Sequence, residues 1–486
     1  MLFNSYEFIF AFLPLTFFIY FFLLNKRLLT GAKGFLVFAS LFFYSWWNIA
    51  YLPLILVSML FNYVLGNSLN SNFKKIKVHK RSLLIFGIFA NLALLGYFKY
   101  ADFFISNVNN LLITNIQLLH LALPLGISFF TFQQIAYLVD SYRQETEEYD
   151  FLNYGLFVTF FPQLIAGPIV HHKEMMPQFS SKWNLAKNYK NIALGIFIFS
   201  IGLFKKVVIA DTFAVWATTG FDHAESLNMF AAWAASLSYT FQLYFDFSGY
   251  TDMAIGAALL FNIKLPINFD SPYKAKNIQD FWRRWHITLS RFLKDYIYIP
   301  LGGNRVSEYR VFTNLLLTFI LGGLWHGAGW TFVFWGFLHG FALVIHRIWK
   351  HFNLTMNSIL AWFITFNFIN ISWVFFRAKT WDDAIKVLSG MLGFNGVMLP
   401  EKWMSSLSYL PINNIQFGTV FQSISGKDNT TTFILAAFIL VLYFKNTMQL
   451  SNSFKPDYKN LILTLAILLI SLSMFSQVSE FLYFNF

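Results

Sequence analysis

The chain contains no cysteine and few charged residues. Its 486 residues include no Cys, and Asp, Glu, Lys and Arg together make up only 12%. The absence of Cys excludes disulfides, thiolate metal sites and an acyl-enzyme intermediate on a cysteine sulfur. Scarce charge combined with 57% hydrophobic residues excludes an ordinary soluble globular protein. The composition therefore predicts an all-α polytopic membrane protein.

Acidic residues are the scarcer of the charged kinds, with 23 Asp and Glu against 35 Lys and Arg, which gives a formal net charge of +12. The basic residues lie in loops between apolar runs, so nucleic acid is not expected as a partner. Cytoplasmic loops of membrane proteins carry such an excess, and four segments have it: 74–81, 274–310, 346–350 and 445–459. Placing all four in the cytoplasm puts both termini outside. The first apolar run lacks the flanks of a signal peptide, so it is expected to be a retained span.

Long hydrophobic runs are abundant. Runs that could span a membrane occur near 6–24, 34–49, 52–69, 82–98, 191–210, 231–262, 357–376, 431–444 and 460–478. The uncharged stretch 311–345 is too long for one span of ~20 residues and short for two, which predicts two short or tilted helices with a break near His326. We expect about eleven to thirteen spans, together with re-entrant and interfacial helices.

Two stretches fit this pattern less simply. Residues 121–140 and 151–170 are both apolar, and the predicted orientation allows only an odd number of crossings between 99 and 190. One of them is therefore expected to be re-entrant, with breaks at prolines and glycines. Residues 378–430 are rich in Ser, Asn, Gly and Thr and are predicted to form the longest external segment, either a solvated loop or a docking surface.

His326 is the first candidate for chemistry. It lies in the uncharged stretch 311–345 and is surrounded by Gly322, Gly323, Gly327 and Gly329. An ionisable side chain at membrane depth is costly and marks a functional site by default, and glycines there permit close approach of backbone or ligand. The alternative is a neutral imidazole that bonds a carbonyl of a neighbouring helix. His339, thirteen residues further on, is expected to be structural.

His286 is the second candidate. A helical wheel of 281–296 places aromatic and aliphatic residues on one face and charged residues on the other, with His286 at a boundary. The pattern favours an interfacial anchor helix on anionic membrane lipid. The functional alternative has His286 facing the interior while basic residues gather a phosphorylated cytosolic substrate: Arg283, Arg284, Arg291 and Lys294.

Two carboxylates interrupt the apolar run 231–262. Asp246 and Asp252 are expected to face away from lipid and to orient an imidazole, pair with an arginine or form a structural hydrogen-bond network. His171 and His172 have no acidic or third histidine ligand at useful spacing, so no metal is expected.

Five motifs in order carry a family resemblance. They are Phe161-Pro-Gln-Leu-Ile-Ala-Gly-Pro-Ile169, Phe245-Asp-Phe-Ser-Gly-Tyr250, Phe281-Trp-Arg-Arg-Trp-His286, Tyr298-Ile-Pro-Leu-Gly-Gly-Asn-Arg305 and Gly323-Leu-Trp-His-Gly327. Ser372-Trp-Val-Phe-Phe-Arg377 and the N-terminal eight residues are similar as well. Together they resemble the membrane-bound O-acyltransferase family, in its bacterial polysaccharide O-acetylation branch.

The resemblance implies one integral membrane domain over 1–486, an acyltransferase core over 121–377 and a helical bundle around a tunnel. It implies that His326 is the catalytic histidine, His286 a second functional position and Trp325 a supporting residue. It also implies transfer of acetyl from cytosolic acetyl-CoA, across the bacterial inner membrane, to a cell-envelope polysaccharide with the help of a periplasmic esterase-like partner. Peptidoglycan is the expected glycan, with alginate or another exopolysaccharide next. The alternatives are an acyl-donor transporter, an assembly scaffold and the D-alanyl transfer protein of teichoic acid.

Overall fold

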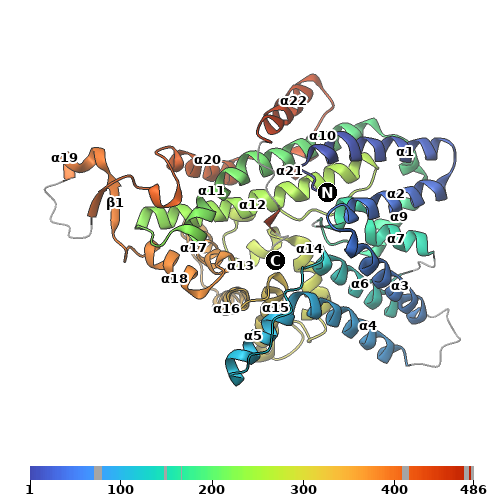
Figure 1. Ribbon diagram of the computed structural model, residues 1–486, viewed down its shortest axis with the longest axis horizontal. Coiled ribbons are helices and arrows are strands. Elements are labelled where there is room, and N and C mark those ends of the chain that lie inside the picture. The colour runs from blue at the N-terminus through green and yellow to red at the C-terminus, as the bar shows by residue number, and fades with distance from the viewer. Residues whose placement is uncertain (71–78, 147–149, 166, 408–414, 476–480, 483–486) are drawn as a thin grey trace. The chain divides into compact units, whose positions relative to one another are not determined.

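The computed structural model describes residues 1–70, 79–146, 150–165, 167–407, 415–475 and 481–482. Residues 74–78 of the predicted basic loop 74–81, which include Lys74, Lys75 and Lys77, lie outside the described residues. The described residues are mainly helical, as expected, and contain two short strands (Figure 1). They form two compact units: unit 1 comprises 1–203, 250–267 and 453–486, and unit 2 comprises 204–249 and 268–452. The predicted core 121–377 has residues in both units.

Six helical segments of the described chain are long and apolar enough to cross a membrane. They are Glu7–Asn25, Ile49–Leu69, Lys80–Leu112, Tyr189–His223, Trp330–His351 and Ser358–Arg377. Three shorter apolar helices are Leu29–Ser45, Thr430–Tyr443 and Tyr458–Ser473. Each predicted apolar run overlaps a helix, which confirms a polytopic all-α membrane protein, while the number of crossings stays a prediction.

Unit 1 contains the N-terminal helices and the last one. Its helices are α1 (Leu13–Asn25), α2 (Leu29–Ser45), α3 (Leu52–Leu69), α4 (Lys80–Leu95), α5 (Ala101–Leu112), α6 (Ile127–Tyr142), α7 (Phe151–Thr159), α8 (Phe161–Leu164), α9 (His172–Ser180), most of α10 (Tyr189–Phe204), the end of α12 (Met229–Leu260) and α22 (Tyr458–Ser473). Within 121–170, α7 and α8 are too short to span a membrane, which agrees with the expected break in the crossing pattern.

Aromatic rings and amides hold unit 1 together. Phe8 is fully buried, with ring-centroid distances of 4.8 Å to Phe3 and 5.7 Å to Phe43. Between α3 and α4, the Asn91 amide donates to Asn62 Oδ1 at 2.7 Å. Amide bonds between helices satisfy polar groups that lipid cannot, and so they hold membrane helices together.

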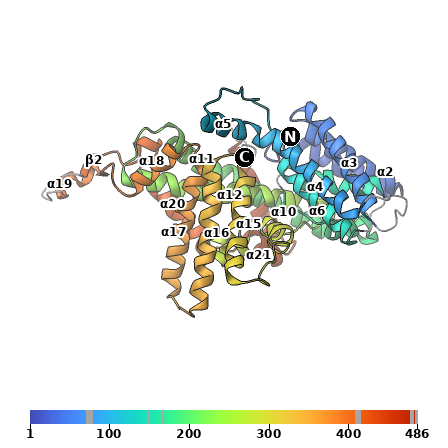
Figure 2. The ribbon, with the colours of Figure 1, turned by 90° about the horizontal axis from the view of Figure 1, so that it is seen from below.

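Unit 2 contains the remaining elements. Its helices are η5 (Lys205–Ala210), α11 (Asp211–Thr218), η6 (Thr219–His223), the first part of α12, α13 (Ile278–Arg284), α14 (Ile287–Leu293), η8 (Lys294–Tyr298), α15 (Glu308–His326), α16 (Trp330–His351), α17 (Ser358–Arg377), α18 (Trp381–Met391), α19 (Met404–Leu407), α20 (Thr430–Tyr443) and α21 (Thr447–Asn452). α16 packs between α15 and α17, and the three helices lie side by side in Figure 2.

The segment 378–430 is not a bare loop. It contains α18, which starts at a capping box between Thr380 and Asp383 and packs against α17. It also contains a small parallel pair of strands, β1 (Val397–Pro400) and β2 (Ile415–Gly418), with Val397 opposite Ile415. Composition alone hid these elements because each is short.

The prediction of one continuous amphipathic helix over 281–296 is wrong. α13 ends at Arg284 and α14 begins at Ile287, because His286 between them has φ 43° and ψ 54°, the left-handed conformation. An L-residue there cannot continue a right-handed helix. The predicted apolar face is nevertheless buried, as Trp282, Leu289 and Phe292 demonstrate. The helical wheel therefore predicted correctly which side chains are buried, but it did not predict the break in the backbone at His286.

Candidate functional site

His326 lies where two helices of unit 2 meet. It is the last residue of α15, and α16 starts four residues later at Trp330, so the predicted break near His326 is confirmed. α15 and α16 approach closely at Gly323 and Gly336: a Cβ on Gly323 would collide with the carbonyl oxygen of Phe332, and one on Gly336 with that of Phe319. Only glycine permits such a backbone contact. The glycines thus set the position of His326 relative to α16.

Aromatic rings enclose the His326 imidazole. Its ring centroid lies 4.8 Å from Trp325, 5.2 Å from Trp335 and 5.1 Å from Phe376, and the residue is 3% exposed. Trp335 in turn stacks on Trp373, with centroids 5.5 Å apart. These rings come from α15, α16 and α17. A titratable side chain here is buried in a mainly aromatic enclosure, in which electrostatic interactions are stronger than in water.

His286 lies at a turn between α13 and α14 that Asn268 holds in place through hydrogen bonds. The backbone carbonyl of Asn268 accepts from Ile287 N at 3.0 Å, and its side-chain Oδ1 accepts from Thr288 N at 3.2 Å and from Thr288 Oγ1 at 3.0 Å. The same Oδ1 lies 3.1 Å from His286 Nδ1. Asn268 therefore holds both the left-handed turn and the imidazole that it carries. Strained backbone of this kind persists only where surrounding contacts impose it.

The bond to Asn268 decides the tautomer of His286. Because Oδ1 receives the Thr288 N–H, this atom is an acceptor, and His286 Nδ1 must donate to it. In the neutral ring, Nε2 then carries the lone pair. Burial lowers the pKa of His286 to about 3, so the imidazole is neutral near pH 7. The neutral ring of His286 therefore has its hydrogen-bond acceptor atom at Nε2.

The two histidines singled out in the sequence lie close together. Their ring centroids are 6.4 Å apart, and the Trp325 ring lies 6.2 Å from that of His286. Phe247 packs edge-on against His286 at 4.8 Å. Forty positions of sequence separate the two imidazoles, so this proximity comes from the fold of unit 2.

His339 shows a different arrangement. Trp282 Nε1 donates to His339 Nδ1 at 3.1 Å, so the proton of the neutral ring is on Nε2, which lies 3.0 Å from Ser372 Oγ. Ser372 Oγ donates in turn to the carbonyl of Ile369 at 2.8 Å. Both ring nitrogens are thus held by the protein's own groups, as expected for a structural histidine.

The predicted basic residues fall into two groups. Arg284 pairs with Asp280 at 2.9 Å, and Lys294 lies 3.4 Å from Asp295, so neighbouring carboxylates already offset these two charges. Arg283 is exposed and forms no ion pair with any carboxylate in the described ranges. Arg291 is half-buried on α14. Arg283 is therefore the best placed of the set to meet an anion from solution.

The two carboxylates of α12 have different surroundings. Asp246 is buried in unit 2 and pairs with Lys206 at 2.6 Å, and Lys206 also lies 3.0 Å from Asp211. The ion-pair partner of Asp246 is therefore a lysine of η5, an ion pair of the kind that a structural polar network, one of the three expected arrangements, would contain. Asp252 is also buried, as predicted, but belongs to unit 1. In unit 1, His171 Nδ1 lies 3.7 Å from Asp140, an acidic neighbour that sequence spacing did not indicate.

The arrangement of motifs agrees with comparison to known proteins. The chain matches the membrane-bound O-acyltransferase family over residues 9–380. It belongs to that family. The resemblance inferred from the motifs is confirmed, and the protein is a multi-pass membrane O-acyltransferase.

Relatives of this acyltransferase differ in the group or glycan that their names give. The peptidoglycan O-acetyltransferase of Helicobacter pylori is 53% identical over all of this chain and 98% of its own length. The probable alginate O-acetylase of Pseudomonas aeruginosa is 39% identical over 85% of this chain and 79% of its own. The teichoic acid D-alanyltransferase of Bacillus subtilis is 28% identical over 52% and 69%.

Several residues of the acyltransferase site were not found from sequence alone. Asn268 lies eighteen positions before His286 in a loop, and nothing in its spacing indicates a contact. Trp373 and Phe376 belong to the Ser372–Arg377 motif, which was noticed without a role. That motif ends in Arg377, whose guanidinium forms a bidentate pair with Asp222 at 3.0 and 2.6 Å and so anchors the end of α17 beside Phe376.

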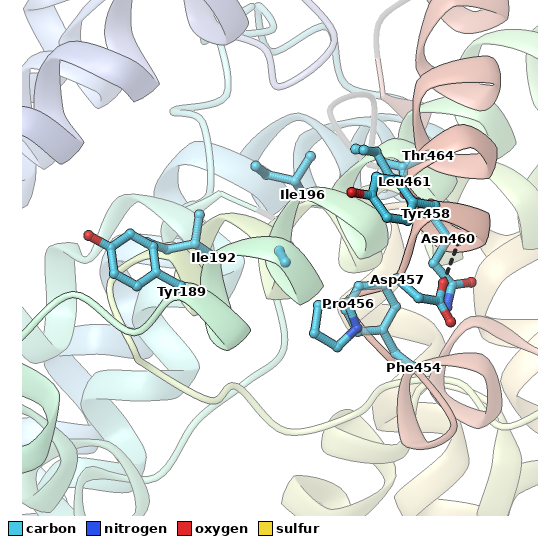
Figure 3. A pocket seen from close by; sticks show the side chains of 11 residues that line it. Tyr189, Ile192, Ile196, Phe454, Pro456, Asp457, Tyr458, Asn460, Leu461 and Thr464 are labelled. Carbon is cyan, nitrogen blue, oxygen red and sulfur yellow. Dashed lines mark hydrogen bonds between the residues drawn. The ribbon is translucent and has the colours of Figure 1, made fainter.

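A separate hollow of about 530 Å³ lies in unit 1 of the acyltransferase, between the start of α10 and the start of α22 (Figure 3). Its walls include Tyr189, Ile192, Leu461 and Thr464. Asp457 at its edge accepts from Asn460 N at 2.9 Å and caps α22. None of the described residues that line this hollow is a histidine.

Proposed function

We propose that this acyltransferase moves acetyl from acetyl-CoA, bound at the cytosolic side of the bacterial inner membrane, to peptidoglycan outside. The observation that carries the proposal is the meeting of His286 and His326 inside a buried aromatic enclosure in unit 2. The N-terminus is taken as periplasmic, because the basic segments then lie in the cytoplasm.

His326 acts as the general base in the proposed reaction. Its neutral imidazole removes the proton of an acceptor hydroxyl while that oxygen attacks the thioester carbonyl carbon. The new C–O bond forms as the C–S bond breaks. The departing CoA thiolate recovers the proton from the imidazolium, so that the enzyme ends in its starting state. Exclusion of water by Trp325, Trp335 and Phe376 protects the thioester from hydrolysis.

Two further groups have roles suited to their chemistry. His286 accepts a hydrogen bond at Nε2, so it can orient the attacking hydroxyl and cannot donate to an oxyanion from that atom while neutral. Trp335 supplies the complementary function: its indole N–H is buried and has no hydrogen-bond partner among the described residues. A buried donor beside the base is suited to the carbonyl oxygen, where negative charge develops.

The residues that contact CoA are proposed from their charge, and the glycan is proposed from the related proteins. Arg283 and Arg291 are the proposed contacts for the phosphates of CoA, since guanidinium groups match phosphate geometry. Peptidoglycan is proposed because the relative with that activity in its name is 53% identical over the full chain. A periplasmic esterase-like protein is proposed to receive the acetyl group and place it on the glycan.

Purified protein in nanodiscs with radiolabelled acetyl-CoA tests this proposal. The acceptors are peptidoglycan fragments and alginate oligosaccharides, each with and without the periplasmic partner, and CoA release is followed in parallel. Wild type should label peptidoglycan, and His326→Gln should bind CoA without transferring acetyl. Labelling of alginate alone would replace the proposed glycan by the one in the name of the 39% identical relative.

The alternatives are distinguished by the same protein reconstituted in sealed proteoliposomes and by a change of acyl donor. A transporter would deliver acetyl-CoA or acetyl across a sealed proteoliposome in the His326→Gln variant as well as in wild type. A D-alanyl transfer protein would accept a D-alanyl thioester in place of acetyl-CoA. Either result would overturn the acetyl-transfer proposal.

A further inference from the structure

A groove of about 630 Å³ lies in unit 2, between α16 and α17 and away from the two histidines. Its long walls are apolar and come from Leu338, Phe341, Ala342, Ile345, Ala361 and Ile364. Both helices are apolar enough to cross a membrane. The volume is in the range of ligand-binding clefts in proteins.

The groove is open on the side that faces away from the helix bundle. Phe341, Ile345 and Ile364 line it and are 46%, 49% and 48% exposed. Side chains of this kind on a spanning helix face hydrocarbon. The opening therefore faces the acyl chains of lipid, and an acyl chain can enter it sideways.

One end of the groove is positively charged. Lys276 and Lys350 line it, together with His346 one helical turn before Lys350. Lys276 Nζ donates to Ser358 Oγ at 3.1 Å, and Lys350 Nζ donates to Gln279 Oε1 at 3.3 Å. Both partners are neutral. Within the described part of the chain, neither lysine forms an ion pair with a carboxylate.

Three arginines of the same unit do have carboxylate partners. Arg284 pairs with Asp280, Arg347 with Glu308 and Arg377 with Asp222. The two lysines of the groove have no such carboxylate partner among the described residues, so the basic end of the groove carries charge that no described carboxylate offsets. Lys350 is the second-last residue of the span Trp330–His351, which places its ammonium near the depth of lipid headgroups.

We propose that the groove binds one anionic phospholipid. Its phosphate lies between Lys276 and Lys350, and one acyl chain runs along the apolar walls between α16 and α17. Basic pockets between membrane helices at the headgroup level bind anionic lipids in this way. Trp349, which also lines the groove, is of the residue type that anchors helices at the interface. This proposal is independent of the acyl acceptor proposed above.

The hollow of unit 1 provides a contrast within the same chain (Figure 3). It is of similar size, about 530 Å³, and is also largely apolar. The charged residue that lines it is Asp457, a carboxylate. A phosphate would be repelled there, so the size and apolar lining of a hollow do not by themselves select an anionic lipid.

Native mass spectrometry of the delipidated full chain tests the proposal. The protein is titrated with phosphatidylglycerol and, separately, with phosphatidylcholine of the same acyl chains. Wild type should bind the first phosphatidylglycerol roughly tenfold more tightly, since each lysine near the headgroup favours an anionic lipid. Lys276→Gln combined with Lys350→Gln should abolish the preference and leave phosphatidylcholine binding unchanged.

Two further variants keep the test specific. Ala361→Phe fills the groove without changing charge and should weaken binding of both lipids. Lys455→Gln combined with Lys459→Gln removes the same charge from exposed positions of unit 1 and should behave like wild type. Thermal unfolding of each variant checks that it is folded.

Three results would overturn the proposal. One is equal binding of the two lipids by wild type. Another is an equal loss of preference in the Lys455/Lys459 control. The third is displacement of phosphatidylglycerol by free CoA, which would assign the two lysines to the donor substrate instead.

Discussion

His286 and His339 are both fully buried histidines of unit 2, and the protein treats their rings differently. Trp282 and Ser372 hold the two nitrogens of His339, whereas Asn268 holds Nδ1 of His286 and so leaves the lone pair of the neutral ring on Nε2. Burial is the same in both cases. The difference is in which ring atoms the surrounding structure holds, and we propose that it separates a structural imidazole from one that takes part in the reaction.

The sharpest test of this comparison is on His326, which lies beside His286. His326→Gln should lower acetyl transfer by about a thousandfold, because a positioned general base contributes ~10²–10⁴ in rate. Single-turnover transfer from labelled acetyl-CoA in nanodiscs measures it. The matched variant His339→Gln should retain activity within about threefold of wild type. Equal losses in the two variants would mean that the histidine pair His286 and His326 does not differ in function from the structural His339.

The next test changes Asn268, which positions His286, instead of a histidine. Asn268→Leu should reduce kcat about a hundredfold with a smaller change in KM, since a misplaced catalytic group can cost that much. Asn268→Asp should retain the acceptor but favour the imidazolium, because an adjacent carboxylate raises a histidine pKa. Its activity should therefore fall at acid pH and recover as pH rises. An Asn268→Asp profile that parallels wild type would show that Asn268 acts only on stability.

A smaller effect is expected at the structural histidine. His339→Leu leaves the Trp282 N–H and the Ser372 hydroxyl without their buried partner, which costs about 1–3 kcal/mol of stability. Thermal unfolding in a mild detergent measures the loss, and activity well below the unfolding temperature should persist. Ser372→Ala should show a part of the same loss, and a double variant tests whether the two share one network.

The pH dependence of stability gives the finest discrimination. The pKa of His286 is about 3 in the folded protein against an ordinary value of 6.5. The unfolded chain therefore binds this proton first as pH falls, and stability is lost from about pH 6.5 downward, by roughly 2 kcal/mol between pH 7 and pH 5. The difference between wild type and His286→Asn isolates this contribution. A difference that does not change with pH would mean that water reaches the ring.

The sequence predicted the apolar helices and singled out two histidines that lie close together, but it did not predict how the histidines are held. The break at His326 was predictable because an uncharged run of fixed length and a cluster of glycines are local features. Asn268 was not, because its contact with His286 depends on a left-handed turn that a helical wheel does not represent. The pairing of Lys206 with Asp246 likewise joins elements forty positions apart, and the sequence offered several cations as partners.

Resemblance recovered more of the site than periodicity did. The Ser372–Arg377 motif was noted without a role, and the structure gives its members distinct contacts: Ser372 with His339, Phe376 with His326 and Arg377 with Asp222. A motif indicates that a set of residues is important as a group. Their individual roles depend on which neighbours the fold supplies.

The close glycine contact between α15 and α16 has a consequence for the entropy of donor binding. Because Gly323 and Gly336 bring the two backbones together, the His326 and Trp335 rings keep their relative position without any help from a substrate. The ordering of these rings is then completed during folding and does not oppose binding. Substitution of either glycine by alanine would push α15 and α16 apart, because the added Cβ collides with a backbone carbonyl oxygen. We expect such a substitution to make the entropy of donor binding less favourable, although neither glycine takes part in the proposed reaction.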